Sequence, residues 1–375
     1  MTSIPEHAAG FTDEAGYLDF ATRGPVGTAV ADEVRGLVDL QARSRFGAGA
    51  ALDEQAGRVR RAVAAVVGVR ADQVAFQSSA AEGLLLVLSG LTGGLLLPTT
   101  SSTAVVLAVH GAAATASGPT PSVVRPAGDV VTVADLAAAV TDETAAVVVS
   151  LVDPRSGALL DLAAVREAVG DRLLVVDADD AFGVVDAPWA LADVVVAGGQ
   201  AGVRAGAGTG FATFSDRALA RLRPALRGVA GSAATAVAPA LVPAPAADAD
   251  AHRLGPADPI AQARLATALE GLAEVGQAAV AAAVADRAAR VVDLADAAAM
   301  PVLTPRVAAE RAGTIVLAPE PAELTALAAA LHNHGITATV REGTVRLSVH
   351  VTTGEATFGL LRDAFTAAAA GTTWA

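Results

Sequence analysis

The stretch LLVVDADDAFGVVDAPWALADVVVAGGQA, residues 173–201, indicates the fold of this chain. It opens with an apolar run at residues 173–177 and reaches a second apolar run at residues 194–197. Neither run alternates with polar residues, which is typical of strands buried on both faces of a parallel sheet. The stretch therefore predicts two strands of an α/β protein, with Asp177 at the C-terminal end of the first.

The same pattern recurs on both sides of this stretch. Helical patterns lie between the apolar runs, and this alternation predicts a mostly parallel sheet with helices on both faces. The further predicted strands are residues 74–77, 95–98, 145–151 and 210–214, and the predicted helices include 53–67, 81–88, 133–140 and 162–169.

A change in composition divides the chain. Residues 228–259 are rich in Ala and Pro and predict an irregular connection. We expect a large α/β domain at about residues 15–250 and a small C-terminal α/β domain at residues 260–375. The small domain would contain a helix over 260–298 broken near Gly276, a strand at 314–317, a helix at 322–332 closed by Gly335, a hairpin of 336–341 and 344–350 about Glu342-Gly343, and a last helix at 354–369.

Composition excludes several kinds of chemistry. All 26 basic residues are arginine, so no lysine is present to form a Schiff base or to act as a base. The chain has no cysteine, which excludes disulfides, thiolate metal sites and a thiol nucleophile. A net charge of −13 and 3% aromatic residues argue against binding to nucleic acid or to anionic membranes. Small molecules or proteins are the expected partners.

Targeting and membrane signals are not evident either. Residues 1–10 carry Glu6 and have no apolar core, so they do not form a signal peptide. No charged residue lies between Glu82 and Arg125, but Gly, Ser, Thr and Pro interrupt the apolar runs before they reach the length of a membrane span. The sequence predicts a soluble cytoplasmic protein.

Several segments resemble, in order, the class V aminotransferase family of pyridoxal-phosphate (PLP) proteins, which includes cysteine desulfurases and isopenicillin-epimerase-like enzymes. The resemblance extends over nearly the whole chain. The similar segments are YLDFA at 17–21 with Gly24-Pro25, QSSAAE at 77–82, VVDADDA at 175–181, DVVVAGGQA at 193–201, RAGAGTGF at 204–211 and VRLSVH at 345–350.

The resemblance implies a homodimer of the PLP-transferase fold, with a cofactor site at the C-terminal ends of the parallel strands. Ser78, Ser79 and Ala80 would bind the phosphate, and Asp177 would accept from the pyridine nitrogen. Thr209 would approach the phosphate of the neighbouring subunit, and Arg346 would hold a substrate carboxylate. A plain helix cap at Ser79, a capping role for Asp177 and a surface position for Arg346 are the alternative interpretations.

The chain departs from that family at the residues that carry the chemistry. Ala201 occupies the position of the lysine that binds the cofactor covalently. Gly198 replaces a phosphate-binding Ser, Gln200 replaces a His, and Asp180 replaces a Gln that would donate to the cofactor's O3′. If PLP or PMP binds, Asp180 and Gln200 are still expected to contact it. Residues 99–103, TTSST, offer no ring to stack on the cofactor. The loss of several such residues together favours natural divergence over an engineered Lys→Ala change.

Three functional hypotheses follow. The first is a catalytically inactive or repurposed homologue that acts as a partner or regulatory subunit, in a homodimer or in a heterodimer with an active paralogue to which it lends residues 206–211. The second is an enzyme, either a Lys→Ala variant or one that uses PLP or pyridoxamine phosphate (PMP) noncovalently. The third is cofactor-free chemistry or binding of a small carboxylate, with Asp177, Asp180 and Arg346 as polar groups. Without a cysteine to carry a persulfide, desulfurase activity has no support.

Other motifs are weak. GAGTG at 206–210 precedes a predicted strand and opens no helix, so it does not fit a dinucleotide-binding loop. His332 and His334 are two metal-ligand types without a third nearby. Asp177, Asp179 and Asp180 would hold a cation only if a turn brought them together, because strand alternation separates the last two. The sequence therefore predicts no metal site.

Overall fold

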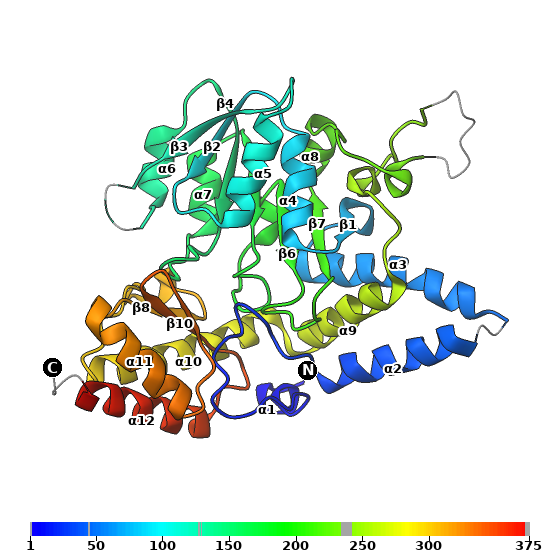
Figure 1. Cartoon of the computed structure of the whole chain (residues 1–375). Helices are drawn as coiled ribbons and strands as arrows, with labels where there is room; N and C mark the ends of the chain where they lie inside the picture. The colour runs from blue at the N-terminus through cyan, green and yellow to red at the C-terminus, as the bar shows by residue number, and fades with distance from the viewer. Residues whose placement is uncertain (1, 44–45, 127, 129, 234–241, 372–375) are drawn as a thin grey trace.

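The computed structural model describes residues 2–43, 46–126, 128, 130–233 and 242–371. Figure 1 shows a large unit around a seven-stranded sheet and, at the lower left, a smaller C-terminal unit around a three-stranded sheet. The α/β class predicted from the sequence is confirmed, and so is the mostly parallel character of the large sheet.

The large sheet has the strand order β1-β7-β6-β5-β4-β2-β3. Four pairs, β2–β3, β2–β4, β4–β5 and β5–β6, are parallel, and β7 is antiparallel to both of its neighbours. The strands are β1 (Val74–Gln77), β2 (Gly94–Pro98), β3 (Thr120–Val124), β4 (Thr144–Ser150), β5 (Leu173–Asp177), β6 (Val194–Gly198) and β7 (Gly210–Phe214).

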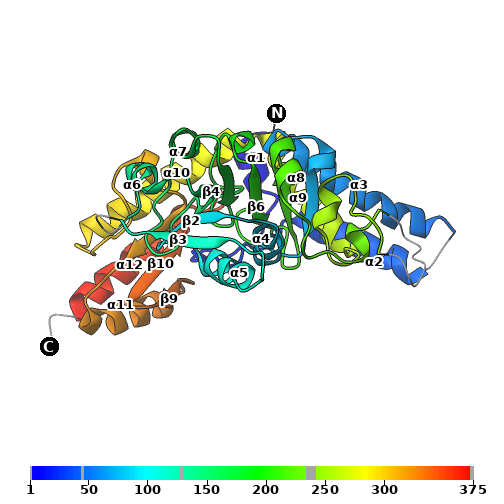
Figure 2. The same cartoon turned by 90° about the horizontal axis from the view of Figure 1, so that it is seen from above.

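Helices cover both faces of this sheet, as Figure 2 shows from above. One face packs against α4 (Ala80–Ser89), α5 (Thr103–Ala113) and α8 (Asp216–Arg221), and the other against α3 (Ala48–Val67), α7 (Leu162–Val169) and α9 (Pro259–Val275). In β5, Leu174 and Val176 pack on the face covered by α3, α7 and α9, whereas Leu173 and Val175 pack on the face covered by α4, α5 and α8. Continuous apolar strands are therefore needed because each face is covered.

Further helices complete the large unit and its N-terminal side. They are α1 (Ile4–Ala8), α2 (Thr28–Arg43) and α6 (Val133–Ala139), with short 3₁₀ turns between other elements. Figure 1 shows α2 and α3 projecting together to the right of the sheet, with α9 alongside.

The predicted break in the long helix is confirmed. Gly276 separates α9 from α10 (Gln277–Ala297), and the two helices meet at an angle of 84°. Within the described residues, this bent pair passes a length and hydropathy test for a membrane span only as a whole, and no single helix passes it.

The C-terminal elements follow the predicted order. They are β8 (Thr314–Leu317), α11 (Pro321–Asn333), β9 (Thr339–Arg341), β10 (Thr344–Ser348) and α12 (Glu355–Gly371). Glu342 and Gly343 both have positive φ, 52° and 79°, which forms the tight turn between β9 and β10. The N-terminal segment joins this unit through bridges of Tyr17 to Thr337 and Asp19 to Ser348.

Candidate functional site

The C-terminal ends of the parallel strands bring several polar residues to one edge of the large sheet. Ser150 ends β4, Asp177 ends β5 and Gly198 ends β6. Ser102 caps the helix that follows β2, since its hydroxyl accepts from the Val105 N–H. In α/β folds this edge is where ligands bind. The resemblance predicted a site at the same edge.

Asp177 is a hydrogen-bond acceptor for three protein groups. Its Oδ2 accepts from the Ser102 hydroxyl at 2.6 Å and from the Ser150 hydroxyl at 2.9 Å. Its Oδ1 accepts from the Asp179 N–H at 3.2 Å, which is the local turn bond that the capping interpretation expects. Burial raises the pKa of Asp177, and the two serine hydroxyls oppose that shift. The carboxylate that would face a pyridine nitrogen is thus already bound by the protein.

Asp179 lies in the turn that follows β5, at the same edge of the sheet. A turn begins after β5, and the exposed Asp179 side chain accepts at Oδ1 from the Gly198 N–H at 2.9 Å. A Cβ atom on Gly198 would lie 2.5 Å from this oxygen and 3.8 Å from the backbone nitrogen of Ala80. The Asp179 carboxylate therefore lies between the end of β6 and the N-terminus of α4.

Titration of Asp179 is shifted toward neutral pH. The surrounding protein removes part of the water from the Asp179 carboxyl. This desolvation, with smaller contributions from the negative charges of Asp177 and Asp180, raises the pKa of Asp179 to about 7. The Gly198 N–H acts in the opposite direction. The carboxyl of Asp179 is therefore partly protonated at neutral pH.

The turn before α4 is closed by a carboxylate of the helix itself. The Ser79 hydroxyl accepts from the Glu82 N–H at 3.2 Å, which caps the helix. The Glu82 carboxylate accepts from both the N–H and the hydroxyl of Ser78, the N–H at 2.9 Å. Ala80 is the first residue of α4 and is buried. The two predicted serine contacts to a phosphate thus have partners within the chain.

Ala201 lies in a buried loop between β6 and β7. The carbonyl of Ala201 accepts from the Arg204 N–H, and the carbonyl of Gln200 accepts from the Gly24 N–H. The Gln200 side chain donates to the Thr22 carbonyl at 2.8 Å. Gln200, predicted to contact the cofactor, is therefore bound to the N-terminal segment.

Arg204 fixes this loop. It is the largest fully buried side chain, and its φ of 61° is rare for a residue with a Cβ. Its guanidinium pairs with Asp13, donates from Nε to the Pro25 carbonyl at 2.6 Å, and lies 3.7 Å from the centre of the Phe11 ring. The loop that carries Ala201 is therefore joined to residues 11–25.

Arg346 and Asp180 form an ion pair between the small sheet and the turn after β5. Arg346 lies on β10, and its Nη2 is 3.4 Å from Asp180 Oδ2. Burial raises the pKa of Asp180, and the positive charges of Arg346 and Arg341 oppose the shift. Arg346 Nε is buried and has no hydrogen-bond partner among the described residues. A polar ligand group at this point would satisfy it.

Thr209 packs against the loop of its own chain. Its hydroxyl donates to the Gly206 carbonyl at 2.5 Å, and a Cβ on Gly199 would lie 2.4 Å from the same hydroxyl oxygen. The predicted contact to a neighbouring subunit stays a prediction.

The weaker motifs gain no support. Gly206–Gly210 leads into β7 rather than into a helix, and His334 Nδ1 lies 2.8 Å from the Ala330 carbonyl of its own helix. A turn does bring Asp177, Asp179 and Asp180 together. Even so, the described residues contain no group of three or more His, Cys, Asp or Glu side chains that could hold a metal ion.

The fold defines a PLP-transferase-like α/β protein. Residues 25–366 match the model of the aminotransferase class-V family, and the chain therefore belongs to that family. A search of the curated proteins finds no matching sequence.

Solved structures share this fold at low sequence identity. The cystine C–S lyase C-DES, in complex with its product cysteine persulfide, is 19% identical, with a TM-score of 0.83 and coverage of 94% of this chain and 97% of C-DES. A cysteine desulfurase from Thermococcus onnurineus NA1 is 18% identical, with a TM-score of 0.82 and 93% of each chain covered. The cysteine desulfurase CsdA from Escherichia coli is 16% identical, with a TM-score of 0.79 and 98% of each chain covered. At these identities the likeness establishes the fold alone.

The residues present do not fit a bound PLP. A dianionic phosphate at the N-terminus of α4 would be repelled by the Glu82 carboxylate, and by Asp179 whenever that carboxyl is ionised. The oxygens of Asp177 already accept three hydrogen bonds, which leaves about one acceptor site for a pyridine N–H. No lysine is present to add a covalent link.

Three residues that make hydrogen bonds at this edge of the sheet, Glu82, Ser102 and Ser150, had no role predicted from the sequence. Glu82 was detectable, because Ser79 and Glu82 have the spacing of a helix capping box. Ser102 and Ser150 had no such signal, since their contact with Asp177 depends on three strands meeting at one edge. Asp179 was noticed as a possible cation ligand only.

Proposed function

We propose that this chain is a non-catalytic member of the class V aminotransferase family, in which protein carboxylates occupy the cofactor cleft. The position of the Asp179 carboxylate between Gly198 and the N-terminus of α4 carries the proposal. The absence of lysine supports it, because no residue of this chain can hold PLP covalently. Homodimer formation, pairing with an active paralogue and a cytoplasmic location stay predictions.

Restoring the lysine alone tests this proposal. We expect Ala201→Lys to form little covalent adduct with PLP, measured by borohydride reduction and mass spectrometry. The double change Ala201→Lys with Asp179→Ala is expected to form more, because the competing carboxylate is gone. Efficient adduct formation by Ala201→Lys alone would contradict the proposal, since it would mean that Asp179 does not obstruct the cofactor.

In place of PLP, the ligand of this site would be a small carboxylate held by Arg346. The buried, unpartnered Nε of Arg346 supports this choice, and Arg155 and Arg341 line the same cavity of about 290 Å³. Planar guanidinium groups bind carboxylates through paired hydrogen bonds. Asp153 and Glu342 also line this cavity, so the three arginines leave an excess of one positive charge, which would favour an anionic molecule.

Malonate is a suitable probe of this binding. We expect it to raise the melting temperature of the protein in a concentration-dependent manner, and to lose that effect in Arg346→Met. The control Arg290→Met changes a half-exposed arginine that pairs with Glu355 away from this cavity, and should keep the response. An unchanged response in Arg346→Met would contradict the carboxylate assignment.

A further inference from the structure

We propose that a second cavity, on the N-terminal side of the loop that carries Ala201, binds a small, neutral and largely apolar molecule. This cavity of about 110 Å³ lies where α1, α2, α9 and α10 meet that loop. The proposal does not depend on whether PLP binds.

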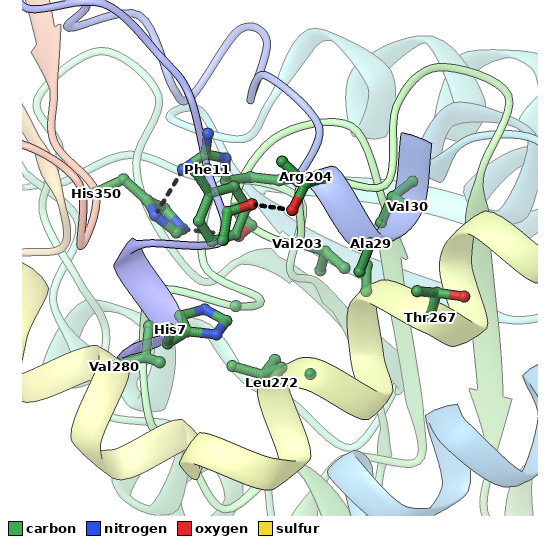
Figure 3. Close-up of a pocket in the computed structure, with 17 residues that line it drawn as sticks. His7, Phe11, Ala29, Val30, Val203, Arg204, Thr267, Leu272, Val280 and His350 are labelled. Atoms are coloured by element: carbon green, nitrogen blue, oxygen red, sulfur yellow. Dashed lines mark hydrogen bonds between the residues drawn. The ribbon is translucent and has the colours of Figure 1, made fainter. Parts of the chain in front are cut away.

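The walls of the cavity come from distant parts of the chain. Figure 3 shows side chains from the four helices and the loop around one space. Apolar groups predominate on these walls, and the buried ones among them are Val30, Val203, Leu272 and Val280. Such an enclosure, with few polar groups, is typical of small-molecule sites.

Gly271 keeps part of this space open. It lies inside α9, and a Cβ atom there would have no heavy atom within 4 Å. Glycine inside a helix is unfavourable compared with alanine. Gly271 faces the cavity, although alanine would fit without any clash. Gly271 weakens its helix but leaves the cavity wider, as expected if this wall contacts a ligand.

Arg204, the only arginine among the described lining residues, is already paired with a carboxylate, and four of its five N–H donors have protein partners. Within the described residues, the Arg204 guanidinium contacts Asp13, the Pro25 carbonyl, Thr352 Oγ1 at 3.3 Å and His350 Nδ1 at 3.5 Å. A ligand anion would have to compete with Asp13, whereas a ligand cation would be repelled by Arg204. The occupant is therefore neutral.

The two histidines of the lining differ in what they offer. His350 is buried, and its Nε2 lies 3.0 Å from the Gly202 carbonyl, so both of its ring nitrogens have partners. His7 is half-buried on α1 and has no side-chain hydrogen bond to any described residue. Burial and the charge of Arg204 lower the pKa of His7, which keeps the ring neutral. The ligand can therefore carry one hydrogen-bonding group for His7.

The volume limits the size of the ligand. An engineered apolar cavity of roughly 150 Å³ holds benzene. A cavity of about 110 Å³ would therefore hold a molecule of that size or slightly smaller.

Fluorobenzene is a direct probe, followed by ¹⁹F NMR on the full-length protein. We expect saturable binding to the unmodified protein and an affinity at least about tenfold lower in Gly271→Leu, whose side chain would fill the cavity. Gly271→Ala, which adds one methyl group and favours the helix, should fall between them and tests the site even if Gly271→Leu does not fold. The control Gly36→Leu changes an exposed glycine inside α2 with the same open surroundings, and should bind like the unmodified protein.

Charge selectivity provides the second part of the test. Benzoate and benzylamine should each bind at least about tenfold more weakly than fluorobenzene. The proposal is overturned if fluorobenzene shows no saturable binding, if Gly271→Ala and a folded Gly271→Leu bind it as well as the unmodified protein does, or if either charged probe binds more tightly.

Discussion

The Asp179 carboxylate accepts a hydrogen bond of 2.9 Å from the Gly198 N–H, and a Cβ on Gly198 would lie 2.5 Å from the same oxygen. The two positions are therefore coupled: a side chain at 198 and a carboxylate at 179 compete for the same space. In the family that this chain resembles, a serine binds phosphate at the position of Gly198. Here the competing group is a hydrogen-bond acceptor, and it carries a negative charge when Asp179 is ionised.

Gly198→Ser should consequently destabilise the protein. A contact of 2.5 Å forces the terminal oxygen of the exposed Asp179 side chain to move, and loss of its hydrogen bond to the Gly198 N–H costs about 1 kcal/mol in the free energy of unfolding. In a background of Asp179→Ala the same change should cost less, because the obstructing carboxylate is absent. Urea unfolding of the two single variants and the double variant would measure this coupling.

Equal costs of Gly198→Ser in both backgrounds would show that the two positions are independent. In that case the Asp179 side chain would not occupy the space beside Gly198, and the argument against phosphate binding would lose its main support.

The free energy of unfolding should vary with pH partly because of Asp179. Its pKa rises from 3.8 to about 7 on folding, so the folded state binds the proton more tightly than the unfolded state. That contribution to stability is complete below about pH 3.8 and is lost as the pH rises through about 7. Asp179→Asn should therefore gain stability relative to the unmodified protein as the pH is raised across this window.

Urea unfolding at a series of pH values across this window would measure the difference. Asp177 and Asp180 also have raised pKa values, so part of the decline with pH should persist in the variant. A stability difference that is the same at every pH would contradict the shift assigned to Asp179.

The buried pair of Asp13 and Arg204 should contribute strongly to stability. Their side chains are 6% and 1% exposed, and removal of one charge leaves the other buried without a partner. Asp13→Asn is expected to lower the free energy of unfolding by about 3–5 kcal/mol, as measured by urea unfolding.

The exposed pair of Arg35 and Asp32 provides the matched control. Both side chains are more than 70% exposed, so Asp32→Asn should change the free energy of unfolding by less than about 1 kcal/mol. If the two Asp→Asn changes had similar effects, Arg204 would not fix the loop through its charge.

Much of the fold could be predicted because apolar runs mark buried strands. Leu173–Asp177 and Gly210–Phe214 were predicted with the observed bounds. The strand β3, Thr120–Val124, was not predicted, because it is an edge strand with four exposed residues and Pro121 and therefore lacks the apolar run.

The candidate site was harder to predict than the fold. Local patterns correctly placed Asp177 at a strand end and Ser79 at a helix start. The position of the Asp179 carboxylate depends on a turn and on a neighbouring strand that ends in glycine. Similarly, the Ser102 hydroxyl reaches Asp177 from the N-cap of α5, and the Ser150 hydroxyl reaches it from the end of β4. Contacts of this kind between distant segments leave no local pattern in one sequence.

Equilibrium dialysis of the purified, unmodified protein against PLP is the most direct measurement. If carboxylates occupy the cleft and no lysine is present, the protein retains no PLP above the level of a protein without a PLP site, and Asp179→Ala retains more than the unmodified protein. Saturable retention of one PLP per chain by the unmodified protein would contradict the proposal.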